Sequence, residues 1–221
     1  MAKAVVARLG IERIQWRVAE FGALLDELEQ GRVDVVAAGM FITPERARRA
    51  AFSEPVFRTG QGLLVRLGNP LDLHAYADLA ARPGARAAVL SGSVEAEMLR
   101  RTGLPEARLV HVPDARTGLT AVETGLADGL ALSAPTLGWM VRSRPDAAVE
   151  LARPFTQPEG DRALGYGGFA FRLQDRQLLT AWNRAQAVLV HGPDYPALLE
   201  GFGFPPEALP GDITTREVLR P

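Results

Sequence analysis

The stretch DVVAAGMFITPERARRAAFSEPVF, residues 34–57, decides the fold of this chain. The apolar run that ends at Phe41 predicts a buried strand. Thr43 and Pro44 then predict a helix start, with threonine as the N-cap and proline in the first turn. This order places Phe41 and Arg46 together at the carboxyl end of the strand, near a helix N-terminus. A planar guanidinium at that point suits a carboxylate, which it can hold through two parallel hydrogen bonds.

A purely structural interpretation of the same residues is also available. Arg46 could pair with Glu45 or Glu54 on the surface, and Phe41 could be an ordinary core residue. Spacing alone leaves both interpretations open.

Composition excludes several function classes. The 221 residues carry a net charge of −1, with 47% hydrophobic and 23% charged residues, which is typical of a soluble globular protein and gives no general attraction for nucleic acid. There is no cysteine, so neither a disulfide nor a thiolate metal site is expected. The three histidines lack metal-ligand spacing, and no P-loop or nucleophile elbow is present. We therefore expect no cofactor, no metal site and no catalytic residues.

A helix, a Gly-x-x-Asp turn and an apolar strand occur in this order twice. The first turn joins Gly31 to Asp34, and the second joins Gly125 to Asp128. Alternating helices and strands predict an α/β protein. The repeat predicts two similarly wound lobes, each a mostly parallel sheet flanked by helices, with the strand ends facing a shared cleft.

The lobe boundaries follow from the linkers. The sequence RLGNP after residue 65 has the composition of a linker, and the strand GYGGFAFR near residue 165 predicts a return to the first lobe. We predict that residues 1–66 and 165–221 form lobe 1 and that residues 67–164 form lobe 2. Two crossings between lobes are typical of clamshell closure around a ligand.

The first residues, MAKAVVARLGIERIQW, predict the end of an amphipathic helix, a stop at Gly10 and then a strand. They contain no continuous apolar h-region, so no signal peptide is expected here.

The sequence LLDELEQGRVDVVAAGMFITPERARRAAFSEPVF resembles the extracytoplasmic solute-binding proteins (family 3) of polar amino-acid ABC transporters. The tail from GGFAFRLQD to LLEGFG is similar to the closing segment of the same family, so the likeness covers nearly the whole chain. Within that family, EFGALL, Phe41 and LVRLGNPL most resemble the ectoine- and hydroxyectoine-binding proteins. The resemblance implies a two-lobed type II periplasmic-binding-protein fold that binds a small zwitterion for a membrane permease. It also implies a periplasmic or cell-surface location.

The resemblance assigns ligand-binding roles residue by residue. Arg46 corresponds to the arginine that binds the ligand carboxylate, and Phe41 and Phe21 correspond to walls of an aromatic box. The remaining assigned residues supply close backbone approach or hydrogen-bond donors, and they are Gly39, Ser91, Gly92, Ser93, Ser133 and Thr136.

One position departs from the amino-acid binders. Many of them have an aspartate for the ligand ammonium where this chain has Ser133. A buried ammonium without a carboxylate partner is costly. The departure favours a delocalised or alkylated cation held over aromatic faces, where each desolvated contact contributes roughly 1–2 kcal/mol.

Compared with the family, the chain begins near the end of the first helix. The resemblance therefore implies that lobe 1 is incomplete, with its first strand and part of its first helix absent. We expect an exposed sheet edge, weakened ligand binding and self-association.

Two other functions use the same fold. A lyase similar to cyclohexadienyl dehydratase would need a general acid, for which Glu20, Glu95 and Glu97 are available, although each is expected to be a solvated helix residue. A ligand-sensing domain of a receptor is the other. Ligand depletion with product distinguishes the lyase from a binding protein.

Overall fold

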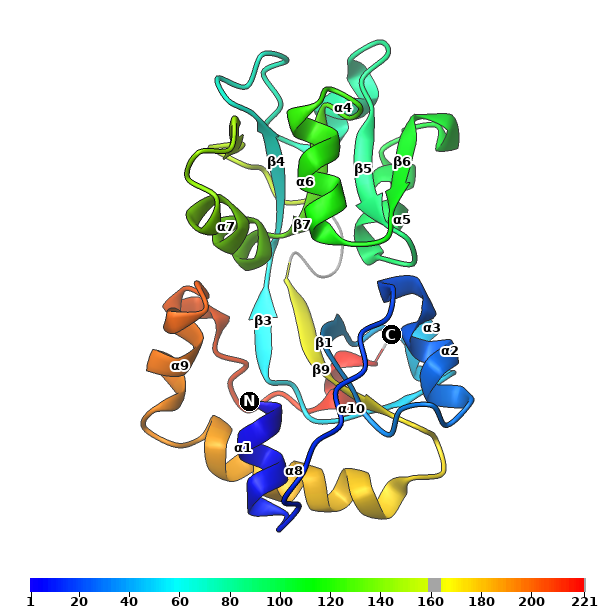
Figure 1. The fold of residues 1–221 in the computed structure, drawn as a ribbon, viewed down its shortest axis with the longest axis vertical. Helices are drawn as coiled ribbons and strands as arrows, with labels where there is room; N and C mark the ends of the chain where they lie inside the picture. Colours follow the sequence, from blue (N-terminus) through cyan, green and yellow to red (C-terminus); the bar gives the residue numbers. More distant parts are fainter. Residues whose placement is uncertain (159–163, 221) are drawn as a thin grey trace. The chain divides into compact units, whose positions relative to one another are not determined.

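The computed structural model describes residues 1–158 and 164–220. Contacts within the chain divide it into two compact units (Figure 1). Unit 1 consists of Met1–Ala19, Ala23–Arg58 and Gly165–Pro221, and unit 2 consists of Glu20–Gly22 and Thr59–Leu164. The chain therefore contributes a short piece, Glu20–Gly22, to unit 2, leaves unit 1 again after Arg58 and returns to it at Gly165.

The sheet of unit 1 is built around one strand. It contains β1 (Val36–Phe41), β2 (Ala51–Phe52), β3 (Phe57–Thr59) and β9 (Gly165–Phe171). β9 lies between β1 and β2, pairs antiparallel with both, and also pairs with β3. The expected mostly parallel sheet is thus corrected, because β1 and β2 both pair antiparallel with the central strand β9. β9, which returns from unit 2, enters the sheet centre in the opposite direction.

Aromatic packing joins the sheet of unit 1 to its helices. The helices are α1 (Ala2–Arg8), α2 (Leu24–Glu29), α3 (Pro44–Ala47), α8 (Arg176–Val190), α9 (Tyr195–Gly201) and α10 (Thr215–Val218), with the short 3-10 turn η3 (Pro206–Ala208). A second 3-10 turn, η1 (Phe21–Ala23), begins in unit 2 and ends in unit 1. Trp182 of α8 packs edge-on against Phe169 and Phe171 of β9, with ring centroids 4.8 and 5.3 Å apart. α1 lies alongside α8 and buries Val5 and Val6 (Figure 1).

Unit 2 is a five-stranded sheet with helices on both faces. Its strand order is β6-β5-β7-β4-β8, where the strands are β4 (Gln61–Arg66), β5 (Ala87–Leu90), β6 (Leu109–Val112), β7 (Gly129–Ser133) and β8 (Val149–Leu151). β5 pairs parallel with β6 and β7, whereas β4 pairs antiparallel with β7 and β8. This sheet is mixed, because β4, the strand by which the chain enters the unit, runs antiparallel to its neighbours.

Two apolar cores cover the two faces of the unit 2 sheet. Helices α4 (Tyr76–Ala81) and α5 (Val94–Arg101) pack into the core that contains Leu63. Helices α6 (Ala115–Glu123) and α7 (Ala134–Ser143) pack into the core that contains Leu64. The alternation of side chains along β4 therefore assigns each of its residues to one helix pair.

The repeated helix-to-strand turn is confirmed. Gly31 and Gly125 both have positive φ, 69° and 73°, a conformation that glycine adopts without a Cβ clash. Asp34 Oδ1 accepts a hydrogen bond from Arg172 Nη2 at 2.8 Å. Asp128 Oδ2 accepts one from the Arg86 backbone N–H, also at 2.8 Å. Each aspartate thus fixes the strand that follows it against a neighbouring segment of its own unit.

The prediction of a strand after Gly10 is wrong. Gly10 ends α1 as predicted, with φ 73°, but residues 11–20 have no regular secondary structure. Ile11, Trp16 and Val18 of this segment are 45%, 56% and 97% exposed. Alternating apolar residues form a strand only beside a partner that completes the ladder, and no strand of the described residues pairs with this segment.

Candidate functional site

The short helix after β1 positions Arg46. Thr43 is the N-cap of α3, and its Oγ1 accepts a hydrogen bond from the Arg46 backbone N–H at 3.3 Å. The side chain turns back toward the end of β1, where Arg46 Nη1 donates to the Phe41 carbonyl oxygen at 2.9 Å. Arg46 is 8% exposed. The predicted helix start and the predicted neighbourhood of these two residues are therefore present, with the guanidinium buried rather than on the surface.

Phe41 lies in an aromatic cluster of unit 1. Its ring makes an edge-to-face contact with Phe57, with centroids 6.2 Å apart and planes at 64°. β9 passes closely, because a Cβ built on Gly165 would lie 2.6 Å from the Phe41 ring. Phe41 is 8% exposed. Gly39, two residues earlier, is exposed, has φ 64° and lies where the β1–β9 register shifts.

Phe57 is a member of this cluster that the sequence analysis did not select. Its ring contacts Phe41 edge-on and Phe204 at a tilt, and it lies close to Gly39 and Gly167. The sequence feature that could have indicated Phe57 is its position at the end of the motif FSEPVF. A single sequence does not show which phenylalanine of such a motif contacts the strand end.

In unit 2, the loop after β5 holds three of the predicted residues. Ser93 is the N-cap of α5 and accepts a hydrogen bond from the Ala96 backbone N–H at 3.4 Å. Gly92 adopts φ 73°. Gly22 packs directly on this loop, because a Cβ built on it would lie 3.0 Å from the Ser91 carbonyl oxygen. The turn that contains Phe21 is thereby held against the loop.

Ser133 and Thr136 lie at the same edge of the unit 2 sheet. Ser133 ends β7, and its Oγ lies 2.8 Å from Thr136 Oγ1 in the first turn of α7. Because β5 and β7 are parallel, their carboxyl ends meet at one edge, and the loop of Ser91 and Gly92 lies there too. Unit 2 thus brings together its predicted residues, while unit 1 holds Gly39, Phe41 and Arg46.

Burial identifies one charged residue on each unit. Among the described residues, the charged side chains classed as buried are Arg46 on unit 1 and Glu95 on unit 2. Glu95 lies in the first turn of α5 and is only 4% exposed. The expectation that it is solvated is wrong, because this face of α5 packs against α4. Glu20 and Glu97 are exposed, as expected.

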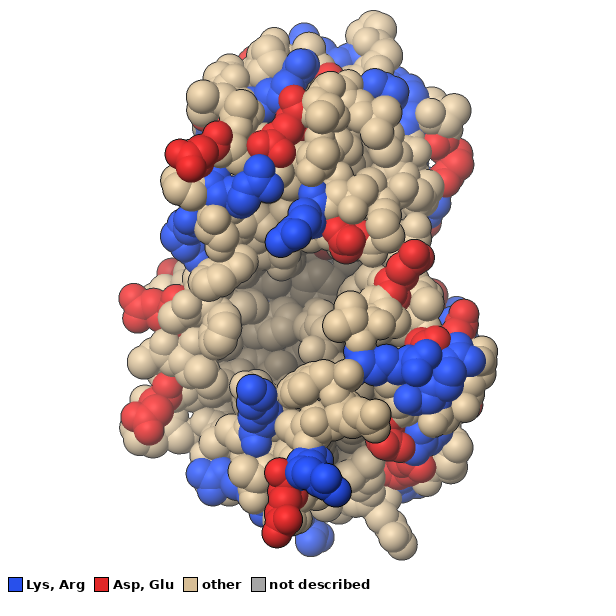
Figure 2. All heavy atoms as spheres, viewed as in Figure 1, with Lys and Arg blue, Asp and Glu red and all other residues tan. Residues whose placement is uncertain are grey.

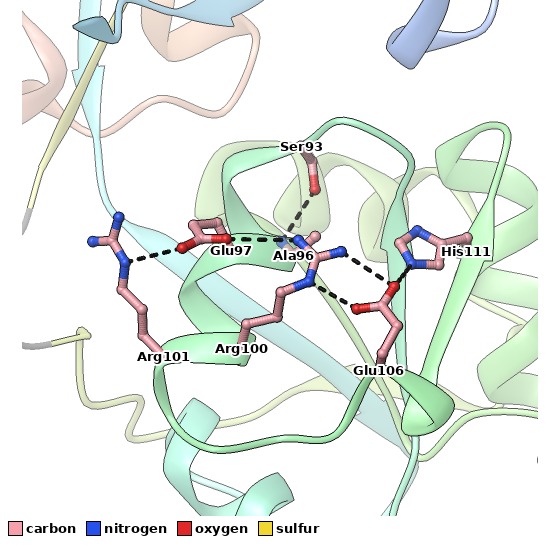
Figure 3. Close-up of polar contacts among 7 residues, drawn as sticks. All are labelled: Ser93, Ala96, Glu97, Arg100, Arg101, Glu106 and His111. Carbon is pink, nitrogen blue, oxygen red and sulfur yellow. Dashed lines mark hydrogen bonds and ion pairs between the residues drawn. The ribbon is translucent and has the colours of Figure 1, made fainter. Parts of the chain in front are cut away.

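The outer face of α5 carries a network of surface ion pairs (Figure 3). Glu97 Oε1 accepts from Arg101 Nε at 3.4 Å, and Arg100 Nε donates to Glu106 Oε2 at 2.8 Å. His111 Nε2 lies 2.8 Å from Glu106 Oε1. Arg100 first, and His111 second, lower the pKa of Glu106 to about 2. This network fixes α5 to the turn before β6.

On one face of the described residues, surface charge marks no concentrated patch. On the face shown in Figure 2, basic and acidic side chains are interspersed. A hollow of about 210 Å³ on unit 1 is lined by Glu29, Arg48, Arg49, Arg172, Leu173 and Gln174. Arg49 already pairs with Asp26 and Glu29 at its rim. The part of the chain that the structure describes holds no cluster of three potential metal ligands among its His, Asp and Glu side chains.

Residues 1–204 match the family described as bacterial extracellular solute-binding proteins, family 3. The chain belongs to this family. The match spans both units, and it agrees with the likeness that the stretch around Arg46 shows.

Two comparisons cover 99% of this family 3 solute-binding chain. It is 34% identical to the probable amino-acid ABC transporter periplasmic-binding protein y4tE of Sinorhizobium fredii, over 224 residues and 73% of that protein. Its fold is similar to that of EhuB crystallised in complex with hydroxyectoine, with a TM-score of 0.89, 28% identity and 83% of that chain covered. The fold is therefore the two-lobed type II α/β architecture with mixed sheets.

A third comparison bears on the enzyme alternative. An ancestral amino-acid-binding protein, AncCDT-1, described as a precursor of cyclohexadienyl dehydratase, is 26% identical with a TM-score of 0.78. The match covers 91% of this chain and 82% of that one. Among the described residues, no helix has the length and apolar character needed to cross a membrane.

Proposed function

We propose that this chain is the substrate-binding component of an ABC importer and that it binds a small zwitterion, with ectoine and hydroxyectoine as the leading ligands. The observation that carries the proposal is the buried guanidinium of Arg46, held at the end of β1 by the Phe41 carbonyl oxygen. Membership of the solute-binding family and the likeness to a hydroxyectoine-binding structure support it.

Arg46 is assigned the ligand carboxylate. Its bond to Phe41 uses one of the five N–H donors of the guanidinium and fixes the plane of the group. A buried, oriented guanidinium binds a carboxylate through short, charge-assisted hydrogen bonds that are stronger than neutral ones. We assign Ser91, Gly92 and Ser93 of unit 2 as further donors to the ligand.

The aromatic residues are assigned the ring or alkyl part of the ligand. Phe41 and Gly39 lie at the end of β1, and Phe21 lies on the turn that packs against the unit 2 loop. Aromatic faces attract delocalised cations. Ser133 and Thr136 supply hydroxyl groups but no negative charge, which agrees with a ligand other than a plain α-amino acid.

The test is a titration panel. Ectoine, hydroxyectoine, glycine betaine, glutamine and arginine are each titrated into the chain by calorimetry, and ligand-observed NMR extends the range to weak binding. The proposal predicts binding of ectoine or hydroxyectoine in preference to both amino acids. A preference for glutamine or arginine contradicts the ligand assignment, and no binding of any of the five contradicts the binding function of this chain.

The same samples distinguish a binding protein from a lyase. We propose no catalytic role. We therefore expect ectoine incubated with the chain to be recovered unchanged. Loss of a ligand together with the appearance of a product would replace the binding function with an enzymatic one. A gene neighbourhood with a sensor kinase, instead of a permease and an ATPase, would favour the receptor alternative.

The importer assignment includes a location and a partner. The family is extracytoplasmic, and we propose that this chain acts in the periplasm or at the cell surface and delivers its ligand to membrane permease subunits. Co-purification with the permease from membranes, increased by ligand, is the expected result. Ligand-independent recovery in the cytoplasmic fraction alone would contradict it.

Self-association is a further part of the proposal. β1 lies at the end of its sheet path, and its residues Ala37, Ala38 and Gly39 are exposed. An uncharged edge strand invites pairing with another chain. We expect concentration-dependent association in sedimentation velocity, reduced by Ala38→Lys, which places a charge on the edge. A monomer at all concentrations would contradict this part of the proposal.

A further inference from the structure

Two polar side chains are buried at the ligand-site edge of unit 2. Glu95 is 4% exposed, and Gln61 is 2% exposed. Gln61 pairs directly opposite Ser133 in the β4–β7 ladder, so it lies at the carboxyl end of β7. Glu95 lies in the first turn of α5, directly after the Ser93 cap. The topology therefore brings both to the edge where the predicted donors lie.

Both side chains are also on the same face of the sheet. Because side chains alternate along β4, Gln61 projects to the side of Leu63, which packs with α4 and α5. Tyr76 of α4 links the two positions. Its hydroxyl donates to the Gly62 carbonyl oxygen at 3.1 Å, and the negative charge of Glu95, after burial, raises its pKa.

The backbone N–H and carbonyl of Gln61 are hydrogen-bonded by the side chain of Gln157. Gln157 Oε1 accepts from the Gln61 N–H at 2.7 Å, and Gln157 Nε2 donates to the Gln61 carbonyl oxygen at 2.8 Å. The buried Gln61 Oε1, in contrast, has no hydrogen-bond partner in the described part of the chain. Buried acceptors without partners are rare because each costs free energy. A ligand N–H that donated to this oxygen would remove that cost.

We propose that Glu95 and Gln61 form the cation-binding part of the ligand site and that they select cations bearing N–H groups. This inference rests on the proposed function and narrows its ligand class. The carboxylate of Glu95 neutralises the ligand's positive charge, and Gln61 Oε1 accepts an N–H. An amidinium such as that of ectoine brings a positive charge to Glu95 and an N–H to the Gln61 oxygen. A quaternary ammonium has no N–H and leaves the Gln61 oxygen unpaired.

Ser133, Thr136 and Glu97 do not provide a buried negative charge for the ligand cation. The hydroxyl groups of Ser133 and Thr136 bond to each other and carry no charge. Glu97 is exposed and pairs with Arg100 and Arg101 (Figure 3). In the described part of unit 2, Glu95 is the acidic side chain that is buried.

The test compares two zwitterions that differ in N–H content. Ectoine carries an amidinium with two N–H groups, and glycine betaine carries a quaternary ammonium with none. Calorimetric titrations use the full chain and the variants Glu95→Gln and Gln61→Leu, with Glu97→Gln as the matched control on the same helix. Circular dichroism and thermal melting establish that each variant is folded, and Glu95→Asp retains the charge if Glu95→Gln does not fold.

We expect Glu95→Gln to weaken ectoine binding at least tenfold. Gln61→Leu should weaken ectoine severalfold without weakening glycine betaine, so the preference for ectoine shrinks. Glu97→Gln should bind both ligands as the unmodified chain does. Unchanged ectoine affinity in folded Glu95→Gln and Gln61→Leu overturns the inference. An equal loss for both ligands in Gln61→Leu also overturns it, because that pattern would indicate a structural role for Gln61.

Failure of the proposed function gives a different pattern. If the unmodified chain binds no zwitterion, the function and this inference fall together. If it binds ectoine and the variants bind equally well, only the inference falls. Conversion of ectoine to a product by the unmodified chain, abolished in Glu95→Gln, would instead make Glu95 an acid catalyst and overturn its role as a charge partner.

Discussion

Arg46 Nη1 donates a hydrogen bond to the Phe41 carbonyl oxygen at 2.9 Å, which ties the buried guanidinium to the end of the strand before its own helix. The bond spans only five residues, so one local motif supplies both the charge and its orientation. Unit 1 thereby presents a fixed cation, and burial at 8% exposure strengthens its attraction for an anion.

Replacing Arg46 should abolish most of the affinity for carboxylate ligands. Arg46→Ala removes charge-assisted hydrogen bonds worth about 1.5–3 kcal/mol each, so we expect at least a tenfold loss of ectoine affinity by calorimetry. Arg46→Lys should recover only part of it, because an ammonium lacks the planar fork. Arg48→Ala, at an exposed position just after the same helix, is the control and should bind normally. Wild-type affinity in Arg46→Ala would contradict the carboxylate assignment.

A carboxylate at position 133 should change the ligand preference. Ser133→Asp places a negative charge at the end of β7, where many amino-acid binders hold the ligand ammonium. We expect the affinity for glutamine or arginine to rise about tenfold or more, since a buried ammonium gains a charged partner. Ser133→Asn, which has the same shape without the charge, separates size from electrostatics. The interpretation fails if the aspartate variant still ignores both amino acids.

Overpacking β9 should destabilise unit 1. A Cβ on Gly167 would lie 2.1 Å from the Phe57 ring, so Gly167→Ala must displace part of the aromatic cluster. Such changes typically cost about 1–3 kcal/mol, measurable as a lower urea midpoint. Gly201→Ala is the control, because a Cβ there has nothing within 4 Å, and it should be neutral or stabilising by up to about 1 kcal/mol. Equal midpoints for the two variants would contradict the described packing.

The Glu106 cluster predicts a pH dependence of stability in the acid range. The folded-state pKa of Glu106 is lowered from 4.5 to about 2, with Arg100 as the largest cause. Its ion pairs therefore contribute stability above pH 4.5, and the contribution is lost as the pH falls toward 2. The free-energy difference between the unmodified chain and Glu106→Gln should shrink over that interval. An NMR titration of the Glu106 carboxyl with a midpoint near 4.5 would contradict the predicted ion pairs.

The local features of the fold could be predicted from the sequence. The Thr43–Pro44 helix start and the Gly31 turn depend on neighbouring residues, and both are present. The direction of β9 could not be predicted, since it depends on how the chain returns after more than one hundred residues in unit 2. The strand expected after Gly10 failed because a strand needs a partner as well as an alternating pattern.

The candidate site likewise contains residues that a local motif predicts and residues whose surroundings depend on distant parts of the chain. Arg46 and Phe41 are close in sequence, so their contact followed from one motif. Glu95 carries no local signal of burial, because its surroundings are set by Tyr76 of α4 and by the sheet beneath. The unpaired oxygen of Gln61 likewise depends on Gln157, which is far away in the chain.

The most direct test of the central claim is a calorimetric competition between ectoine and glutamine for this chain, repeated with Arg46→Ala. We predict that ectoine binds in preference to glutamine and that the Arg46→Ala variant loses at least tenfold in ectoine affinity. Preferential binding of glutamine, or an Arg46→Ala variant that binds ectoine as tightly as the unmodified chain, would contradict the account.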